Sequence, residues 1–351
     1  MISDKDERDD EELQSIIYGR DEMNLAEFPI AMLGKRKPDQ KTIIFADTVY
    51  DEAIKRPVAR TLTITASDLY GLPTSLDEEV ILGAVQLSSR NGFDSRELRF
   101  TRYEFLKLLN WTINDVNYKR LEESLNRWTG ITLKYDKAWW DKTAQSWVSE
   151  TFHIIENISI YDNETKQAFL ARFPHDPSAG LSRIVWNEII FKSFHAGNIK
   201  RLDFDFYTSL ETAIAKRIFR FLDKRFYRSK WLEFELRSFA TNHIGVSDAY
   251  DSTNLKVKLR PAIQELEKKG FIVPVAESQR FYSPRRGKHY IRFERATATS
   301  PTPPHASTTT APEKGSSESV PLRIVPRPDR TPTKEELELM CDKFNLRWRP
   351  S

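Results

Sequence analysis

The sequence predicts an α+β protein of two tandem winged-helix domains, with a disordered acidic head before them and a disordered tether after them. Two observations predict this class. Apolar residues at helical spacing alternate with short β-branched runs, and the order helix, strand, helix, helix and hairpin occurs twice. The expected parts are a head at 1–25, domains at 26–175 and 176–295, a Pro/Ser/Thr-rich linker at 296–333, and a short terminal helix and tail at 334–351.

Charge is divided unevenly along the chain. Of 351 residues, 54 are Lys or Arg and 51 are Asp or Glu, for a net charge of +3. Residues 1–22 hold nine carboxylates and three bases, which leaves a net charge of +9 on the rest. A basic body is typical of proteins that bind polyanions such as nucleic acid. The alternative is a soluble protein that is merely rich in charge.

Cysteine content and hydropathy indicate the compartment. Cys341 is the single cysteine, so the sequence predicts neither an intrachain disulfide nor a cysteine cluster for metal. No apolar run is long enough to span a membrane, and the N-terminus is acidic rather than signal-like. We therefore expect a cytoplasmic protein with no membrane partner.

The first domain is expected to open with an anchoring segment at 24–34, NLAEFPIAMLG, that packs on the body. Strands are predicted at 41–50 and 60–66 from their β-branched residues. Ser75 with Glu78 predicts a capping box, which begins a helix that ends near an Asn-Gly pair.

A strand at 97–100 and two more helices follow. Thr101 with Glu104 predicts a second capping box, and another helix is expected from about 112 to 129. Strands over 131–140 and 146–161 are expected to form the first wing. The candidate DNA-binding side chains of the 112–129 helix are Asn117, Lys119, Arg120 and Arg127, although Asp115, Glu122 and Glu123 on the same helix would repel phosphate.

The second domain repeats the order, with helices predicted at 186–194, 208–228 and 235–243 and strands at 200–206 and 231–234. Asp203 and Asp205 are expected on the solvent side of their strand rather than at a metal. The middle helix ends in KRIFRFLDKRFYRSK, whose bases suit phosphate contact. The candidates there are Arg225, Arg228 and Lys230. The alternative is that the aromatic residues are core and the bases form a solvated face.

The last helix of the second domain is expected to read DNA. Ser252 is the predicted N-cap, Gly270 the predicted end, and Pro261 lies inside. An apolar stripe (Leu255, Leu259, Ala262, Ile263 and Leu266) faces the core. A polar and basic face lies opposite, where the candidate DNA-binding residues are Thr253, Lys256, Val257, Lys258, Arg260, Gln264 and Lys268.

A basic wing is expected after this helix, with strands at 271–275 and 288–294 and a loop at 276–287. Its candidate DNA-binding residues are Arg280, Arg285, Arg286 and Lys288. A helix with a basic outer face beside a basic hairpin suits double-stranded DNA, because the helix enters the major groove while the hairpin contacts phosphate. The alternative is an ordinary helix and hairpin with solvated lysines.

The sequence argues against an enzyme. No GxxxxGK[ST] phosphate loop is present, so ATP hydrolysis is not expected. The six histidines form no HxH or HxxxH pair of the kind that a metal-dependent nicking site uses. We therefore expect no catalytic residue, no metal site and no cofactor.

Three motifs carry a resemblance to a known family: NLAEFPI at 24–30, GLPTSLDEEVILGA at 71–84 and LNRWTGIT at 125–132. With them, the body at about 24–295 resembles the replication initiator protein A family of bacterial plasmids. PAIQEL at 261–266 is also similar to the second reading helix of iteron-binding initiators. The resemblance implies binding to double-stranded DNA repeats at an origin, opening of the duplex and recruitment of host replication proteins such as a helicase or an initiator ATPase, without catalysis. A homodimer and single-stranded DNA binding are also compatible with it.

Two alternative functions stay open at this point. A transcriptional repressor or autoregulator could share the winged-helix architecture, and a single-stranded DNA-binding replication protein could share the basic, aromatic stretch. The two ends of the chain predict auxiliary roles. Leu337, Met340 and Phe344 give the terminal helix an apolar face for docking, and the acidic head could compete with phosphate for the basic faces.

Overall fold

The computed structural model describes residues 19–34, 39–51, 55–176 and 178–296. All of them lie in one compact unit, Met1–Thr299. Most of the expected acidic head, the linker and the terminal helix lie outside the described residues. None of the helices in the described part is both long and apolar enough to cross a bilayer.

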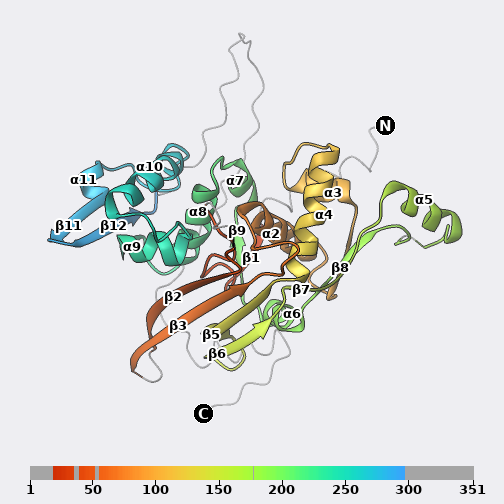
Figure 1. Ribbon diagram of the computed structural model, residues 1–351, viewed down its shortest axis with the longest axis horizontal. Helices are drawn as coiled ribbons and strands as arrows, with labels where there is room; N and C mark the ends of the chain where they lie inside the picture. Colours follow the sequence, from red (N-terminus) through yellow and green to blue (C-terminus); the bar gives the residue numbers. More distant parts are fainter. Residues whose placement is uncertain (1–18, 35–38, 52–54, 177, 297–351) are drawn as a thin grey trace, which may run out of the picture. The chain divides into compact units, whose positions relative to one another are not determined.

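The first repeat combines helices with a three-stranded antiparallel sheet of order β4-β8-β7 (Figure 1). Its elements, in chain order, are α2 (Ser75–Arg90), β4 (Glu97–Phe100), α3 (Arg102–Leu108), α4 (Asp115–Thr129), β7 (Ile155–Ser159) and β8 (Ser182–Trp186). The ten-residue helix α5 (Asn163–Arg172) lies between β7 and β8 in the chain. Because β8 pairs with β4, the first sheet extends past the expected domain boundary at residue 175.

The second repeat has the same element order and an equivalent sheet, β10-β12-β11. Its elements are α8 (Ala213–Phe226), β10 (Trp231–Glu235), α9 (Leu236–Ser238) continued by the π-helix η1 (Phe239–Ile244), α10 (Ser252–Lys268), the short helix α11 (Glu277–Arg280), β11 (Phe281–Arg285) and β12 (Lys288–Glu294). In both repeats the last strand lies in the middle of the sheet. The predicted duplication of element order is therefore present in the structure.

Most of the expected first wing belongs to a different sheet, which corrects that prediction, and only its last part, β7, lies in the sheet of the first repeat. A four-stranded antiparallel sheet of order β2-β3-β5-β6 contains β2 (Thr42–Asp51), β3 (Arg56–Thr65), β5 (Thr132–Asp141) and β6 (Ser146–Phe152). The expected 146–161 strand is divided into β6, which ends at Phe152, and β7, which begins at Ile155, and Ile154 and Ile155 are both fully buried there. Successive residues of a strand point to opposite faces, so two buried neighbours mark the passage from one sheet to the next.

Two helix caps lie one residue before the expected ones. Asp77 accepts hydrogen bonds from the backbone N and the Oγ1 of Thr74, which makes Thr74 the N-cap of α2 in place of Ser75. Asp251 caps α10 by accepting from the backbone N of Asn254 at 2.8 Å, so Ser252 is the first helical residue. The predicted cap at Thr101 is confirmed.

Three expected elements of the second repeat are shorter than predicted or absent as such. The 200–206 strand is β9 (Ile199–Leu202), after which Asp203 caps the helix α7 (Phe204–Ser209) by accepting from the backbone N of Phe206. The long 208–228 helix begins only at α8, capped by Thr212, because Leu210 is extended. Residues 271–275 make one isolated bridge, Ile272 to Arg295, rather than a strand.

The anchoring segment is confirmed and includes part of the expected head. Strand β1 (Gly19–Glu22) pairs with β9, and Leu25, Phe28 and Ile30 are buried in the core. Asp21 and Glu22 are themselves almost fully buried. The head therefore ends before residue 19, because these carboxylates have partners inside the fold. The helix α6 (Glu188–His195) also contributes, since Ser193 donates to Glu22 at 2.7 Å.

Candidate nucleic-acid interface

The apolar stripe of α10 is buried as predicted, which turns the opposite side of the helix to solvent. Pro261 lies inside the helix, and Gly270 follows its end with a φ of 74°. A positive φ is easily adopted only by glycine, so the chain turns sharply there. Five of the predicted DNA-binding residues are exposed on the outer side, namely Thr253, Val257, Lys258, Gln264 and Lys268.

Two further cations on α10 are half-buried because they contact neighbouring side chains. Lys256 Nζ lies 5.7 Å from the ring centroid of Phe281. Arg260 Nη2 donates to Glu277 Oε1 at 2.5 Å. These contacts hold the charged groups at the edge of the outer face of α10, where they remain partly accessible.

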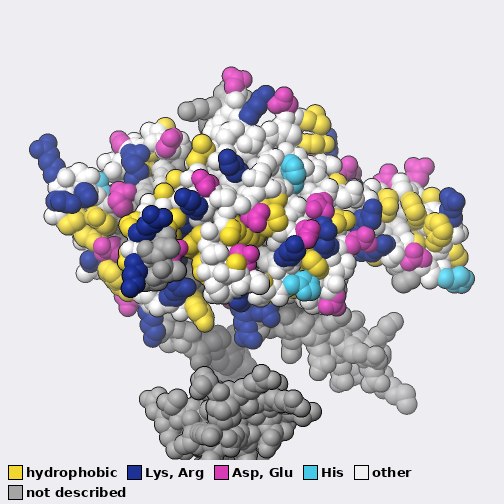
Figure 2. All heavy atoms as spheres, turned by 90° about the horizontal axis from the view of Figure 1, so that it is seen from below, with side chains coloured by type: hydrophobic (Ala, Val, Ile, Leu, Met, Phe, Trp, Pro, Cys, Tyr) yellow, Lys and Arg dark blue, Asp and Glu magenta, His cyan; other side chains and the backbone are white. Residues whose placement is uncertain are grey.

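The hairpin β11–β12 presents three exposed cations at its tip. Gly287, with a φ of 81°, makes the turn, and Arg285, Arg286 and Lys288 flank it. Figure 2 shows Lys and Arg side chains beside hydrophobic ones on its left, the side on which Figure 1 draws β11 and β12. Positive charge at a hairpin tip suits contact with a phosphate backbone.

Arg280 does not belong to this surface, which corrects its inclusion among the DNA-binding residues. Its side chain is 3% exposed and lies over the ring of Phe293. The guanidinium donates to Glu267 at 2.6 Å and to the carbonyl oxygens of Val273 and Arg292. Arg280 therefore fastens α11 to α10 and to the sheet.

Most side chains of the basic run at 216–230 also pack or form ion pairs within the fold. Phe219, Phe221 and Phe226 are core residues, in line with the alternative interpretation of this run. Five of its seven bases pair with carboxylates of α2 and the anchoring segment, namely Lys216, Arg217, Arg220, Lys224 and Arg225. Arg225 pairs with Glu27 and keeps 32% of its side chain exposed, whereas Arg228 and Lys230 are exposed.

A buried ionic cluster results from these pairs and joins the anchoring segment to both repeats. Burial disfavours the charged form of Glu27, but Lys224, Arg225 and Arg60 outweigh this and hold its pKa well below the usual range. Burial likewise opposes the charge on Arg220, and Asp21 with Glu78 raises its pKa nonetheless. Glu27 and Arg220 are each stabilised by opposite charges at hydrogen-bonding distance, whereas Arg217 Nη1 lies 3.6 Å from Glu78 Oε1.

The helix α4 of the first repeat offers fewer cations than expected. Asn117 is buried, and its Nδ2 donates to the carbonyl oxygen of Thr112 at 2.7 Å. Arg127 donates to the carbonyl oxygen of Tyr70 and pairs with Asp77. Both residues are corrected to structural roles. Lys119 and Arg120 are exposed, and Lys119 lies 4.0 Å from Glu123 on the same helix.

An aromatic row on the sheet of the second repeat was not predicted. Arg292 Cζ lies 4.2 Å from the ring centroid of Tyr282 and 5.2 Å from that of Trp231, and Tyr282 stacks on Tyr290 at 5.6 Å. Trp231 is 49% exposed, and Tyr227 nearby in sequence is 88% exposed. The row crosses β10, β12 and β11. The strand register brings these residues together. In the sequence, only the spacing of Tyr290 and Arg292, two residues apart in β12, indicated that they share a face of the sheet.

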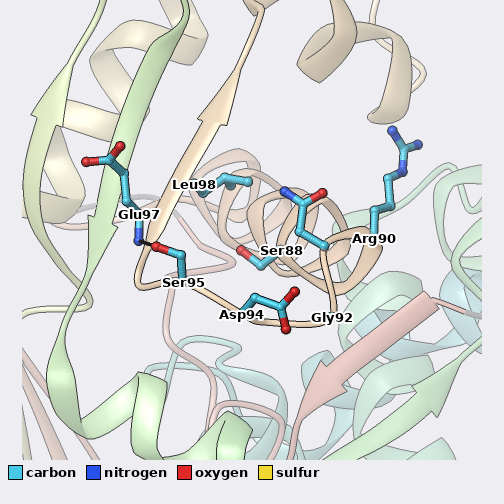
Figure 3. Close-up of a pocket in the computed structure, with 8 residues that line it drawn as sticks. Ser88, Arg90, Gly92, Asp94, Ser95, Glu97 and Leu98 are labelled. Atoms are coloured by element: carbon cyan, nitrogen blue, oxygen red, sulfur yellow. Dashed lines mark hydrogen bonds between the residues drawn. The ribbon is translucent and has the colours of Figure 1, made fainter. Parts of the chain in front are cut away.

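A pocket of about 430 Å³ lies between the end of α2 and β4 (Figure 3). Three of its polar side chains have partners within the fold: Ser95 Oγ accepts from the backbone N of Glu97, Ser88 Oγ accepts from Trp186, and Arg90 pairs with Glu104. In the part of the chain that the structure describes, no three His, Cys, Asp or Glu side chains group as a metal site requires.

Comparison with known proteins gives one family match and several structural similarities. The family model described as Replication initiator protein A matches residues 20–246. A selenomethionine form of domains 2 and 3 of RctB aligns with a TM-score of 0.48 and 10% identity, over 79% of this chain and 99% of that chain. A second structure of RctB domains 2-3 aligns with a TM-score of 0.42 and 10% identity, over 76% and 95%. No curated protein matches. The family match ends before α10.

Proposed function

We propose that this chain, which belongs to the replication initiator protein A family, binds double-stranded DNA repeats at a replication origin through its second repeat. Family membership gives the chain a role in the initiation of replication. The proposal adds that it acts on a plasmid in the cytoplasm, assists duplex opening and recruits host replication proteins without catalysis.

The observation that carries the proposal is the pairing of α10 with the hairpin β11–β12. A buried stripe fixes which side of α10 faces outward, and that side carries exposed Lys258, Gln264 and Lys268. The hairpin tip adds three exposed cations. Together with the sheet order β10-β12-β11, this supports a winged helix in which α10 reads base edges and the hairpin contacts phosphate.

The two repeats have unequal parts in this proposal. The corresponding helix of the first repeat, α4, exposes Lys119 and Arg120 beside Asp115 and Glu123, so its charge is nearly balanced. Carboxylates near phosphate oppose binding, because like charges repel. We therefore assign base reading to α10 and at most backbone contact to α4.

A binding experiment with Gln264→Ala tests the proposal. The full chain selects its site from a randomised duplex library, and fluorescence anisotropy then measures affinity for that site and for random duplex. Gln264→Ala should lose about 1 to 3 kcal/mol on the selected site and little on random DNA. The matched control is Gln167→Ala, an exposed glutamine on α5, which should bind both as the wild type does. Equal losses on both DNAs would exclude α10 as the reader.

The aromatic row favours a second candidate function, binding of single-stranded DNA. Unpaired bases stack on exposed aromatic rings, while nearby cations attract the backbone. Trp231 is half exposed, and Arg228 and Lys230 precede it in the chain. Trp231→Ala should weaken binding to an oligo-dT strand by about 1 to 3 kcal/mol and leave duplex affinity unchanged. Unchanged oligo-dT binding would reject this function.

A further inference from the structure

The short helix α11 lies along the side of α10, and a series of contacts holds it there (Figure 1). Along α10, Lys256 lies against Phe281, Arg260 pairs with Glu277, and Glu267 pairs with Arg280. Arg280 is buried and hydrogen-bonded to three different segments. Glu277, three residues before it, is therefore held in place beside the outer face of α10.

The pair of Arg260 and Glu277 remains accessible to a ligand. The Arg260 side chain is 40% exposed and that of Glu277 is 58% exposed. Among the described residues, their hydrogen bond uses Nη2 of Arg260 and Oε1 of Glu277. Nη1 of the guanidinium and Oε2 of the carboxylate are left for other partners. The pair thus presents an array of guanidinium donors next to a carboxylate acceptor.

Such an array matches one base pair in the major groove. A G·C pair offers the N7 and O6 acceptors of guanine followed by the N4 amino donor of cytosine. Arginine binds the two guanine acceptors, and a carboxylate accepts from the cytosine amino group. We propose that Arg260 and Glu277 together read a single G·C pair, in which Glu277 recognises the cytosine. This inference rests on the proposed duplex-reading role of α10.

The arrangement also explains why a carboxylate lies on an otherwise basic surface. A carboxylate beside a phosphate backbone weakens binding to every duplex. If Glu277 accepts a hydrogen bond from a cytosine amino group, this repulsion is offset only on the correct sequence. Glu277 would then increase discrimination between the specific site and random DNA while lowering affinity for random DNA.

Base analogues test each half of the array separately. In the duplex that the full chain selects, every G·C pair in turn receives 7-deazaguanine, which lacks N7, or N4-methylcytosine, which loses the amino hydrogen that faces the groove. At one pair, each analogue should reduce wild-type affinity about 5- to 100-fold. Arg260→Ala should no longer respond to 7-deazaguanine there, and Glu277→Ala should no longer respond to N4-methylcytosine.

Glu294→Ala is the matched control, because Glu294 is an exposed carboxylate on β12 of the same repeat. Both glutamate variants lose one negative charge, so both should bind random duplex somewhat more tightly. Only Glu277→Ala should lose the response to N4-methylcytosine. Thermal unfolding that matches the wild type would confirm that each variant is folded.

Two outcomes separate this inference from the function on which it rests. If Glu277→Ala responds to N4-methylcytosine at every G·C pair as the wild type does, the inference is wrong and duplex reading by α10 is unaffected. If the wild-type chain selects no motif from the library, the proposed function fails and this inference fails with it.

Discussion

The buried pair of Asp21 and Arg220 gives the most direct test of the fold. Arg220 donates to Asp21 through Nε at 2.9 Å and through Nη2 at 2.7 Å, and both side chains are at most 2% exposed. Asp21→Asn keeps the size of the side chain but removes its charge. The positive charge of the Arg220 guanidinium would then remain buried with one neighbouring negative charge instead of two, that of Glu78.

The expected loss follows from that partial compensation. Removing one member of a buried ion pair costs about 3 to 5 kcal/mol. Because Glu78 remains, we expect the lower end, about 3 kcal/mol. At about 2 to 4 °C per kcal/mol, the Tm should fall by roughly 6 to 12 °C. Circular dichroism during heating or urea titration measures this change.

The control is the same substitution at an exposed pair. Asp68 lies 2.6 Å from Lys41, but their side chains are 84% and 59% exposed. Water and salt screen such a pair, so Asp68→Asn should shift Tm by no more than about 2 °C. If Asp21→Asn melts as close to the wild type as this control, the anchoring segment is not a part of the stable fold.

Three other perturbations have defined outcomes. The double change Arg285→Ala with Arg286→Ala should weaken all duplexes alike and lower the slope of log affinity against log salt by about one to two, and an unchanged slope would place the hairpin tip away from phosphate. Burial lowers the pKa of His243 to about 4. Its neutral form therefore contributes fully to the free energy of unfolding above the unfolded pKa of about 6.5, and this contribution, about 3 kcal/mol, is lost as the pH falls towards 4. In urea titrations, His243→Phe should make the free energy of unfolding less dependent on pH between about 6.5 and 4. Deleting 333–351 should leave duplex affinity unchanged in anisotropy, and a loss would assign DNA contacts to that segment.

The prediction for the acidic head changes with the structure. Deleting residues 1–22 would remove β1 and the carboxylate of Asp21 that pairs with α8, so any change in DNA affinity would be mixed with unfolding. A deletion of 1–18 leaves β1 in place. If the head competes with phosphate, this shorter deletion should raise affinity for random duplex at low salt.

Local periodicity was sufficient to predict most helices of the two repeats. The stripe from Leu255 to Leu266 predicted both the existence of α10 and its outward side, since helix geometry places every third or fourth residue on one face. Capping residues located helix starts to within one residue, as at Thr74 and Asp251. The exposed cations of the hairpin tip were predicted from the sequence of one short segment, in which Arg285, Arg286 and Lys288 flank Gly287.

The tertiary structure alone decided which charges are available to a ligand. Arg280 looks like its exposed neighbour Arg285 in the sequence, but Glu267 of α10 holds it inside the fold. Arg225 likewise looks like the exposed Arg228, but Glu27, far along the chain, leaves it only 32% exposed. The same holds for Asp21, which composition assigns to an acidic head. A charged side chain is buried only when its partner arrives with it. That pairing, like the strand register that aligns Trp231 with Tyr282, depends on contacts between segments that no local pattern encodes.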